Sequence, residues 1–170
     1  MNKRLSILIT ALMAIGLFNG ATCKVSLSGQ QVPPDVQSIT IQYFPNQSAL
    51  VAPALSQTFT EALKDKFLQE SDLDVIPQGG DWELSGAIVR YESTPIAPTG
   101  TETTALNRLT ISIKVEFISR KNEAENWSQT FMRFEDYESS LTLNQAEADL
   151  IPRLSTQIAD DILQKLTQNW

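Results

Sequence analysis

The only cysteine of the chain, Cys23, stands where a bacterial lipoprotein would be cut and acylated. Two cations, Lys3 and Arg4, open the chain, a mostly apolar run covers 5–18, and small residues lead to the cysteine. That order is typical of a secretory signal peptide. The apolar run is shorter than the about 20 residues that a spanning helix needs. We therefore expect residues 1–22 to be a lipoprotein signal peptide and Cys23 to carry acyl chains such as palmitate.

An ordinary signal peptide with a chance cysteine nearby is the alternative. Thr22 is bulkier than the Gly, Ala or Ser that usually precedes a lipidated cysteine, and Gly20 stands where a Leu is common. A mass measurement of the mature N-terminus distinguishes the two interpretations.

Other reactive groups occur without the partners that catalysis needs. The chain has no histidine, so an imidazole base and a serine–histidine triad are absent. A glycosidase needs two carboxylates facing each other across a cleft, and neighbours in sequence do not provide that arrangement. Such neighbouring acids are Asp72 with Asp74, Glu135 with Asp136, and Asp160 with Asp161. Their spacing is not that of a calcium-binding loop. We expect neither an enzyme nor a metal or cofactor site.

The charge balance limits the partners. The chain has 13 Lys and Arg against 20 Asp and Glu, a net charge of −7. Removal of 1–22 takes away two cations and no acids, which leaves a net charge of about −9. Nucleic acid, which requires a basic surface, is therefore not an expected partner. Any membrane attachment has to come from the acyl chains.

Hydrophobic periodicity predicts one α+β domain over 36–170, after a lipidated tether at 23–35 that contains two prolines. A strand is expected over 36–44, and a helix follows in which Leu55, Phe59, Leu63 and Phe67 recur every fourth residue. A strand begins at Trp82, and Gly86 within it suggests a bulge or a close backbone approach. A loop without apolar period is expected over 93–104.

The next strand has the clearest alternation. Its inward residues are Leu109, Ile111, Ile113, Val115 and Phe117, and its outward residues are Arg108, Thr110, Ser112, Lys114 and Glu116. A last strand is predicted over 127–137. The final helix is expected from near Asn144, with Glu147 completing a capping box. Within it, Pro152 predicts either a kink or the true start of the helix.

The element order is therefore strand–helix–strand–strand–strand–helix. Each helix has one apolar stripe, so both are expected on one face of a four-stranded, mostly antiparallel sheet. The opposite face must then be solvated or covered by another molecule. The last strand has apolar side chains on both of its faces, including Met132 and Phe134. One of them belongs either to the core or to a docking surface, because buried interfaces favour aromatic residues, Met and Arg.

Residues 39–71 resemble the LptE family of lipopolysaccharide-assembly lipoproteins, in its Bacteroidota branch. The resemblance rests on Tyr43-Phe44-Pro45-Asn46, Pro53, 55–57 and 59–67, with support from Pro33-Pro34-Asp35 and Leu150-Ile151-Pro152. It implies the same α+β fold and a lipid-anchored protein of the outer membrane, on its periplasmic side or inside a barrel. The expected partner is an LptD-like outer-membrane barrel, bound one-to-one, in whose lumen the chain acts as a plug during transport of lipopolysaccharide to the outer leaflet.

The resemblance also implies contact with lipopolysaccharide, whose phosphates would be met by cations. The candidate cations for the glycolipid or the barrel are Arg90, Arg108, Lys114, Arg120 and Arg133. Because the chain is strongly acidic, the plug role is favoured over direct binding of the glycolipid. Lys24-Val25-Ser26 contains no acidic cluster of the kind that surface-exported lipoproteins carry, which favours the periplasmic leaflet. The alternative function is a periplasmic binding lipoprotein, such as an activator of a cell-wall enzyme.

Overall fold

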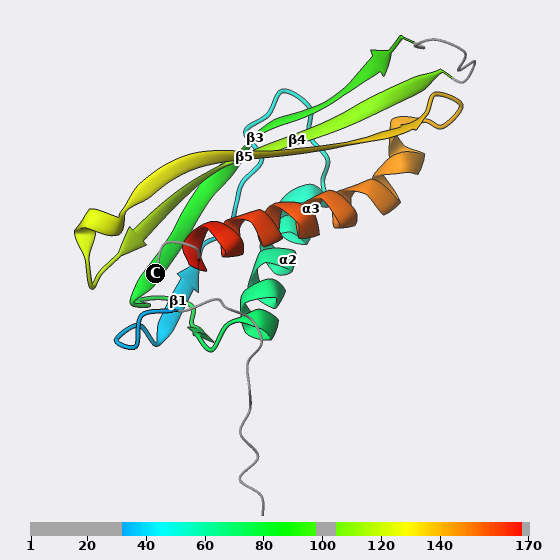
Figure 1. Cartoon of the computed structure of the whole chain (residues 1–170). Helices are drawn as coiled ribbons and strands as arrows, with labels where there is room; N and C mark the ends of the chain where they lie inside the picture. Colours follow the sequence, from blue (N-terminus) through cyan, green and yellow to red (C-terminus); the bar gives the residue numbers. More distant parts are fainter. Residues whose placement is uncertain (1–31, 98–104, 168–170) are drawn as a thin grey trace, which may run out of the picture.

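A computed structural model describes residues 32–97 and 105–167 (Figure 1). Cys23 and the expected signal peptide lie outside the described residues. The strands are β1 (Ser38–Ile41), β2 (Asp74–Val75), β3 (Trp82–Ile96), β4 (Leu106–Ser119) and β5 (Trp127–Glu138). The helices are α2 (Leu55–Glu70), α3 (Leu143–Thr167) and the short 3-10 helix η1 (Glu123–Glu125).

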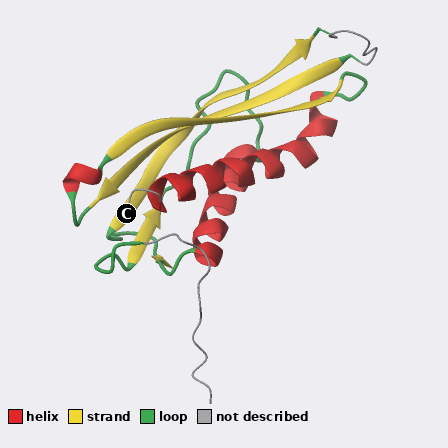
Figure 2. Cartoon of the chain, viewed as in Figure 1, coloured by secondary structure: helices red, strands yellow, loops and turns green. Residues whose placement is uncertain are grey.

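The five strands form one mixed sheet in the order β2-β1-β3-β4-β5. β1 runs parallel to β2 and β3, whereas β3, β4 and β5 are antiparallel neighbours. The predicted α+β fold with two helices against a sheet is confirmed (Figure 2). The sheet has one more strand than the four expected. β2 is only two residues long, which is too short for alternation to be recognised in the sequence.

The core lies between the sheet and the two helices. All five predicted inward residues of β4 are buried, as are Phe59, Leu63 and Phe67 of α2. Leu154, Ile158 and Ile162 complete the layer from α3. The apolar stripes of both helices therefore meet the same face of the sheet, as predicted. Because side chains alternate along a strand, the residues between the buried ones point to the opposite face.

β3 extends beyond its predicted end, so the prediction of a loop from Ser93 was wrong for 93–96. These residues pair with β4, with Ser93 opposite Leu109 and Ile96 opposite Leu106. A register shift between Ile88 and Arg90 reverses the alternation of side chains halfway along the strand. Because of this reversal, apolar residues do not alternate in one register over the whole of β3, so the sequence pattern does not indicate its second half. The rest of the predicted loop falls partly on 98–104, outside the described residues.

Gly86 marks a close backbone approach, as predicted. Its φ is +154°, and a Cβ at this position would lie 2.0 Å from the carbonyl oxygen of Lys114 on β4. A side chain here would therefore push β3 and β4 apart. The bulge itself lies further along the strand, next to Val89.

The start of α3 differs from the prediction. The capping pair is Thr142 and Gln145: the backbone N–H of Thr142 donates to the Gln145 side-chain oxygen at 2.9 Å. Glu147, the predicted capping residue, instead accepts a hydrogen bond from the Tyr91 hydroxyl on β3. Pro152 lies inside the helix and does not define its start.

Candidate functional site

The most distinctive surface of the described chain is the side of the sheet that carries no helix, called here the open face. It consists of alternate residues of the three long strands. They are Glu83, Ser85, Ala87, Arg90, Glu92 and Thr94 of β3; Arg108, Thr110, Ser112, Lys114, Glu116 and the 44% exposed Ile118 of β4; and Ser128, Thr130, Met132, Phe134 and Asp136 of β5. The outward row predicted for β4 is thus part of this face.

Small hydroxyl side chains occupy the centre of the open face. Thr110 lies between its cross-strand neighbours Glu92 and Phe134 and is buried by them. Ser112 is buried in the same way between Arg90 and Met132. A partner that approaches the open face therefore meets the longer side chains of β3 and β5 first.

Both apolar candidates for docking belong to the open face. Met132 is 53% exposed and Phe134 is 47% exposed, whereas their odd-numbered neighbour Phe131 is 7% exposed on the helix side. Tyr137 is also buried on that side. β5 therefore contributes to the core with one set of residues and offers two large apolar side chains to solvent with the other.

Every candidate cation is paired with a carboxylate. Arg90 pairs with Glu92 and Lys114 with Glu116, both two residues apart on one strand, the second pair at 2.8 Å. Arg120, at the end of β4, contacts Glu83 at 3.2 Å. Sequence reasoning missed these pairs, although the spacing of two residues on a strand places both members on the same face.

Arg108 has the most complete set of partners. Its Nε and Nη2 donate to the two carboxylate oxygens of Asp136 at 2.7 and 2.9 Å, and its Cζ lies 3.9 Å from the centre of the Phe134 ring. The hydrogen bond from Arg108 lowers the pKa of Asp136, and the same bond raises the pKa of the Arg108 guanidinium. A phosphate could bind Arg108 only by competing with this carboxylate.

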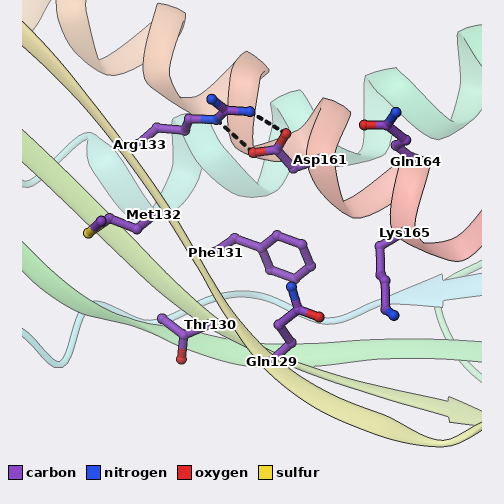
Figure 3. A pocket seen from close by; sticks show the side chains of 8 residues that line it. All are labelled: Gln129, Thr130, Phe131, Met132, Arg133, Asp161, Gln164 and Lys165. Carbon is purple, nitrogen blue, oxygen red and sulfur yellow. Dashed lines mark hydrogen bonds and ion pairs between the residues drawn. The ribbon is translucent and has the colours of Figure 1, made fainter.

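Arg133 is separated from the other candidate cations. Its side chain lies on the helix side of β5, where Nε donates to Asp161 of α3 at 2.7 Å (Figure 3). The pair flanks an open groove of about 360 Å³ between β5 and α3, with Phe131, Gln129 and Lys165 among its lining residues. The structure thus brings together Arg90, Arg108, Lys114 and Arg120 on or beside one face, and leaves Arg133 on the other.

Two of the three acidic pairs of the sequence, Glu135 with Asp136 and Asp160 with Asp161, form ion pairs with cations. Asp160 contacts Lys66 of α2, and Glu135 contacts Arg153 of α3. Among residues 32–97 and 105–167, no group of three or more Cys, Asp and Glu side chains is arranged to hold a metal. No helix within the same described ranges is long and apolar enough to cross a membrane.

The family model of lipopolysaccharide-assembly LptE proteins matches residues 36–166, almost the whole described chain. The chain belongs to the LptE family. The resemblance read from 39–71 is thereby confirmed and extended over the second half of the chain. LptE proteins are non-catalytic assembly lipoproteins, so this family member is not an enzyme.

Solved structures show the same fold at low sequence identity. A protein from Xanthomonas campestris has a TM-score of 0.55 at 15% identity, covering 85% of this chain and 91% of its own. A minor lipoprotein from Acinetobacter baumannii has a TM-score of 0.53 at 14% identity, covering 79% and 94%. The rare lipoprotein B of Shewanella oneidensis has a TM-score of 0.50 at 13% identity, covering 76% and 95%. No curated protein matches by sequence.

Proposed function

We propose that this LptE-family chain is an outer-membrane lipoprotein, acylated at Cys23, that plugs the lumen of an LptD-like barrel in a one-to-one complex. In this role it helps to assemble the barrel that delivers lipopolysaccharide to the outer leaflet. The family match over residues 36–166 is the observation that carries the proposal. The open face and the anchor supply the physical argument.

The chemistry of the open face suits a water-filled, polar lumen. A chain inserted into such a lumen keeps much of its surface in contact with water and polar groups, so a broad apolar patch would be unfavourable. The open face instead has ion pairs, hydroxyl groups and three exposed large apolar side chains, Met132 and Phe134 of β5 and Ile118 at the end of β4. Met132 and Phe134 then act as local anchors within a polar interface, because a few such residues supply most of the energy of a typical interface.

The pairing of the cations favours the plug role over direct binding of lipopolysaccharide. A glycolipid phosphate that approached the open face would have to displace Asp136 from Arg108 or Glu116 from Lys114. Each exchange gives up one charge-assisted interaction to gain another, so its net gain is small. A polar and hydrated protein surface leaves the same pairs in place, because it does not compete for the cations as a phosphate does.

The anchor has a defined place in this proposal. Lipidation of Cys23 would hold the domain at the membrane in which the barrel is built, with 23–35 as the tether. A single acyl chain binds a membrane only weakly, whereas several chains on one cysteine anchor a protein stably. Because no acidic cluster follows Cys23, we infer retention on the periplasmic leaflet. Removal of the protein by a protease added to intact cells would contradict this placement.

Purification of the full-length lipoprotein in mild detergent tests the proposal. We expect a large outer-membrane barrel to co-purify at about one-to-one stoichiometry. Phe134→Asp should leave the protein folded and reduce the recovered barrel. Leu68→Asp is the matched control, because Leu68 is another large apolar residue, 59% exposed on α2. It should leave recovery unchanged. Recovery of a cell-wall synthase in place of a barrel would overturn the proposal.

A further inference from the structure

The outer edge of β5 is an unpaired row of backbone hydrogen-bonding groups. β5 is the last strand in the sheet order, and no strand formed by residues 32–97 or 105–167 pairs with its far side. The N–H of Ser139 donates to the carbonyl oxygen of Ala105 at 3.0 Å. The β4–β5 register then continues without a shift, so hydrogen-bonded pairs alternate along it. The odd-numbered residues of β5 therefore bond to β4, and the even-numbered residues from Ser128 to Asp136 direct their N–H and C=O groups outward. Beyond them, the Glu138 carbonyl accepts a hydrogen bond from the N–H of Leu141 at 3.0 Å.

The first half of this edge, 127–132, lacks the usual protection against strand pairing. Natural edge strands are kept apart by short length, proline, bulges or charged residues. β5 has 12 residues, its register shows no bulge, and its sequence contains neither Pro nor Gly. The unpaired end of β3 is different, since Pro95 removes one of the donors on its outer side and the strand is bulged near Val89. An extended segment is thus expected to pair with β5 and not with β3.

The charges of β5 are unevenly distributed. The first half, 127–132, has no charged residue, and all four charges, Arg133, Glu135, Asp136 and Glu138, lie in the second half. An antiparallel copy of the same strand would place its charged half opposite the uncharged half. Like charges directly opposite each other destabilise a strand pair, so this distribution favours self-pairing.

The geometry selects one register. Only even-numbered residues have outward donors and acceptors, so even residues must face even residues across a two-fold axis. The strand has its midpoint between Met132 and Arg133, and an axis through either residue pairs eleven of its residues. The axis through Arg133 would place two guanidinium groups opposite each other. The axis through Met132 instead places Arg133 opposite Phe131, Glu135 opposite Gln129, and Asp136 opposite Ser128.

We propose that two copies of this chain associate through antiparallel pairing of their β5 edges about a two-fold axis at Met132, forming one continuous ten-stranded sheet. The groove between β5 and α3 supports this register. Phe131 and Gln129 line this open groove (Figure 3). In the proposed register, the Arg133 and Glu135 side chains of the second copy arrive beside these two residues on the helix side. On the open face, the two Met132 side chains meet, and each Phe134 faces a Thr130.

The inference goes beyond the proposed function. A barrel that holds a single copy has no second copy to pair with, so the proposed dimer forms between copies that are not inside a barrel. The net charge of the chain opposes the association, since two acidic copies repel each other. Added salt screens that repulsion and leaves backbone hydrogen bonds in place. The dimer should therefore become tighter as the salt concentration rises, whereas a dimer held by ion pairs would weaken.

A charge-complementation experiment tests the axis. Only a residue on the two-fold axis meets its own copy. Met132→Lys alone and Met132→Glu alone should each weaken the dimer of the full-length lipoprotein at least about tenfold, because like charges then face each other and an apolar contact is lost. A mixture of the two variants should form a heterodimer, measured by sedimentation equilibrium in detergent. Melting curves confirm that each variant is folded, since Met132 is half exposed.

Disulfide trapping tests the register. The full chain carrying Cys23→Ala has no other thiol, so an added cysteine is its only reactive group. Met132→Cys should crosslink under mild oxidation at least about fivefold more than Thr130→Cys or Phe134→Cys, because opposite residues lie within disulfide range and residues two positions off the axis do not. A wild-type chain that stays monomeric at millimolar concentration, single-charge variants that dimerise unchanged, or equal crosslinking at all three positions would each overturn the proposal.

Discussion

The two faces of the sheet are built from the same strands by different rules. On the covered face, β4 contributes five apolar residues that are all buried against the helices. On the open face, the same strand contributes mostly charged and hydroxyl residues, which interact with one another, with β5 and with water. The covered face thus determines whether the chain folds, and the open face determines what the folded chain meets. A substitution on one face is expected to change a different measurement from a substitution on the other.

The largest effect is expected from truncation on the covered face. Ile113→Ala removes a fully buried side chain and leaves a cavity, so the free energy of unfolding should fall by about 2–4 kcal/mol. Met132→Ala removes a side chain of similar size from the neighbouring strand, but from the open face. It should cost less than about 1 kcal/mol. Urea denaturation of the two variants measures both values, and equal losses would show that the open face also belongs to the core.

The contrast between the faces also explains what the sequence could predict. Burial imposes an alternation of apolar and polar residues on β4 and an apolar residue at every fourth position of α2 and α3. Both patterns can be recognised in the sequence. The reversed alternation after Ile88 was not, because a bulge changes the side of every later residue without a composition signal. On the open face, the sequence indicates that β5 has apolar side chains on both sides, but it does not decide whether Met132 and Phe134 belong to the core or to a docking surface. The pairing of Arg108 with Asp136 was not foreseeable, since it depends on the register between two strands.

An intermediate effect on the free energy of unfolding is expected from Asp81, whose side chain holds the start of β1. The Asp81 carboxylate accepts hydrogen bonds from the backbone N–H groups of Gln37 and Ser38, at 2.9 and 3.2 Å, and contacts Lys121 at 3.0 Å. The backbone bond from Gln37, followed by the bond from Lys121, lowers the pKa of Asp81 from 3.8 to about 2. The stabilisation is therefore complete above the ordinary pKa and is lost as the pH falls through about 2.

Asp81→Asn should lower the free energy of unfolding by about 1 kcal/mol at neutral pH, because an amide oxygen accepts these bonds less strongly than a carboxylate. The difference between variant and wild type should shrink between pH 4 and pH 2, as the wild-type carboxyl takes up its proton. Denaturation curves recorded across this range provide the measurement. Asp74→Asn on the short strand β2 serves as a control for general loss of negative charge. A difference that is constant with pH would show that the carboxylate does not form these bonds in solution.

The smallest effect on stability is expected from the ion pairs of the open face. Arg108 and Asp136 form a two-pronged pair above Phe134, but both side chains remain about one-third exposed, and water competes for them. Arg108→Gln, Asp136→Asn and the double variant should therefore unfold at the wild-type midpoint, whereas all three should change the recovery of the barrel if this face is the docking surface. Recovery measured alongside unfolding separates the two roles. A clear loss of stability in the single variants that the double variant restores would assign the pair to the fold, and the open face would then share the structural role of the covered one.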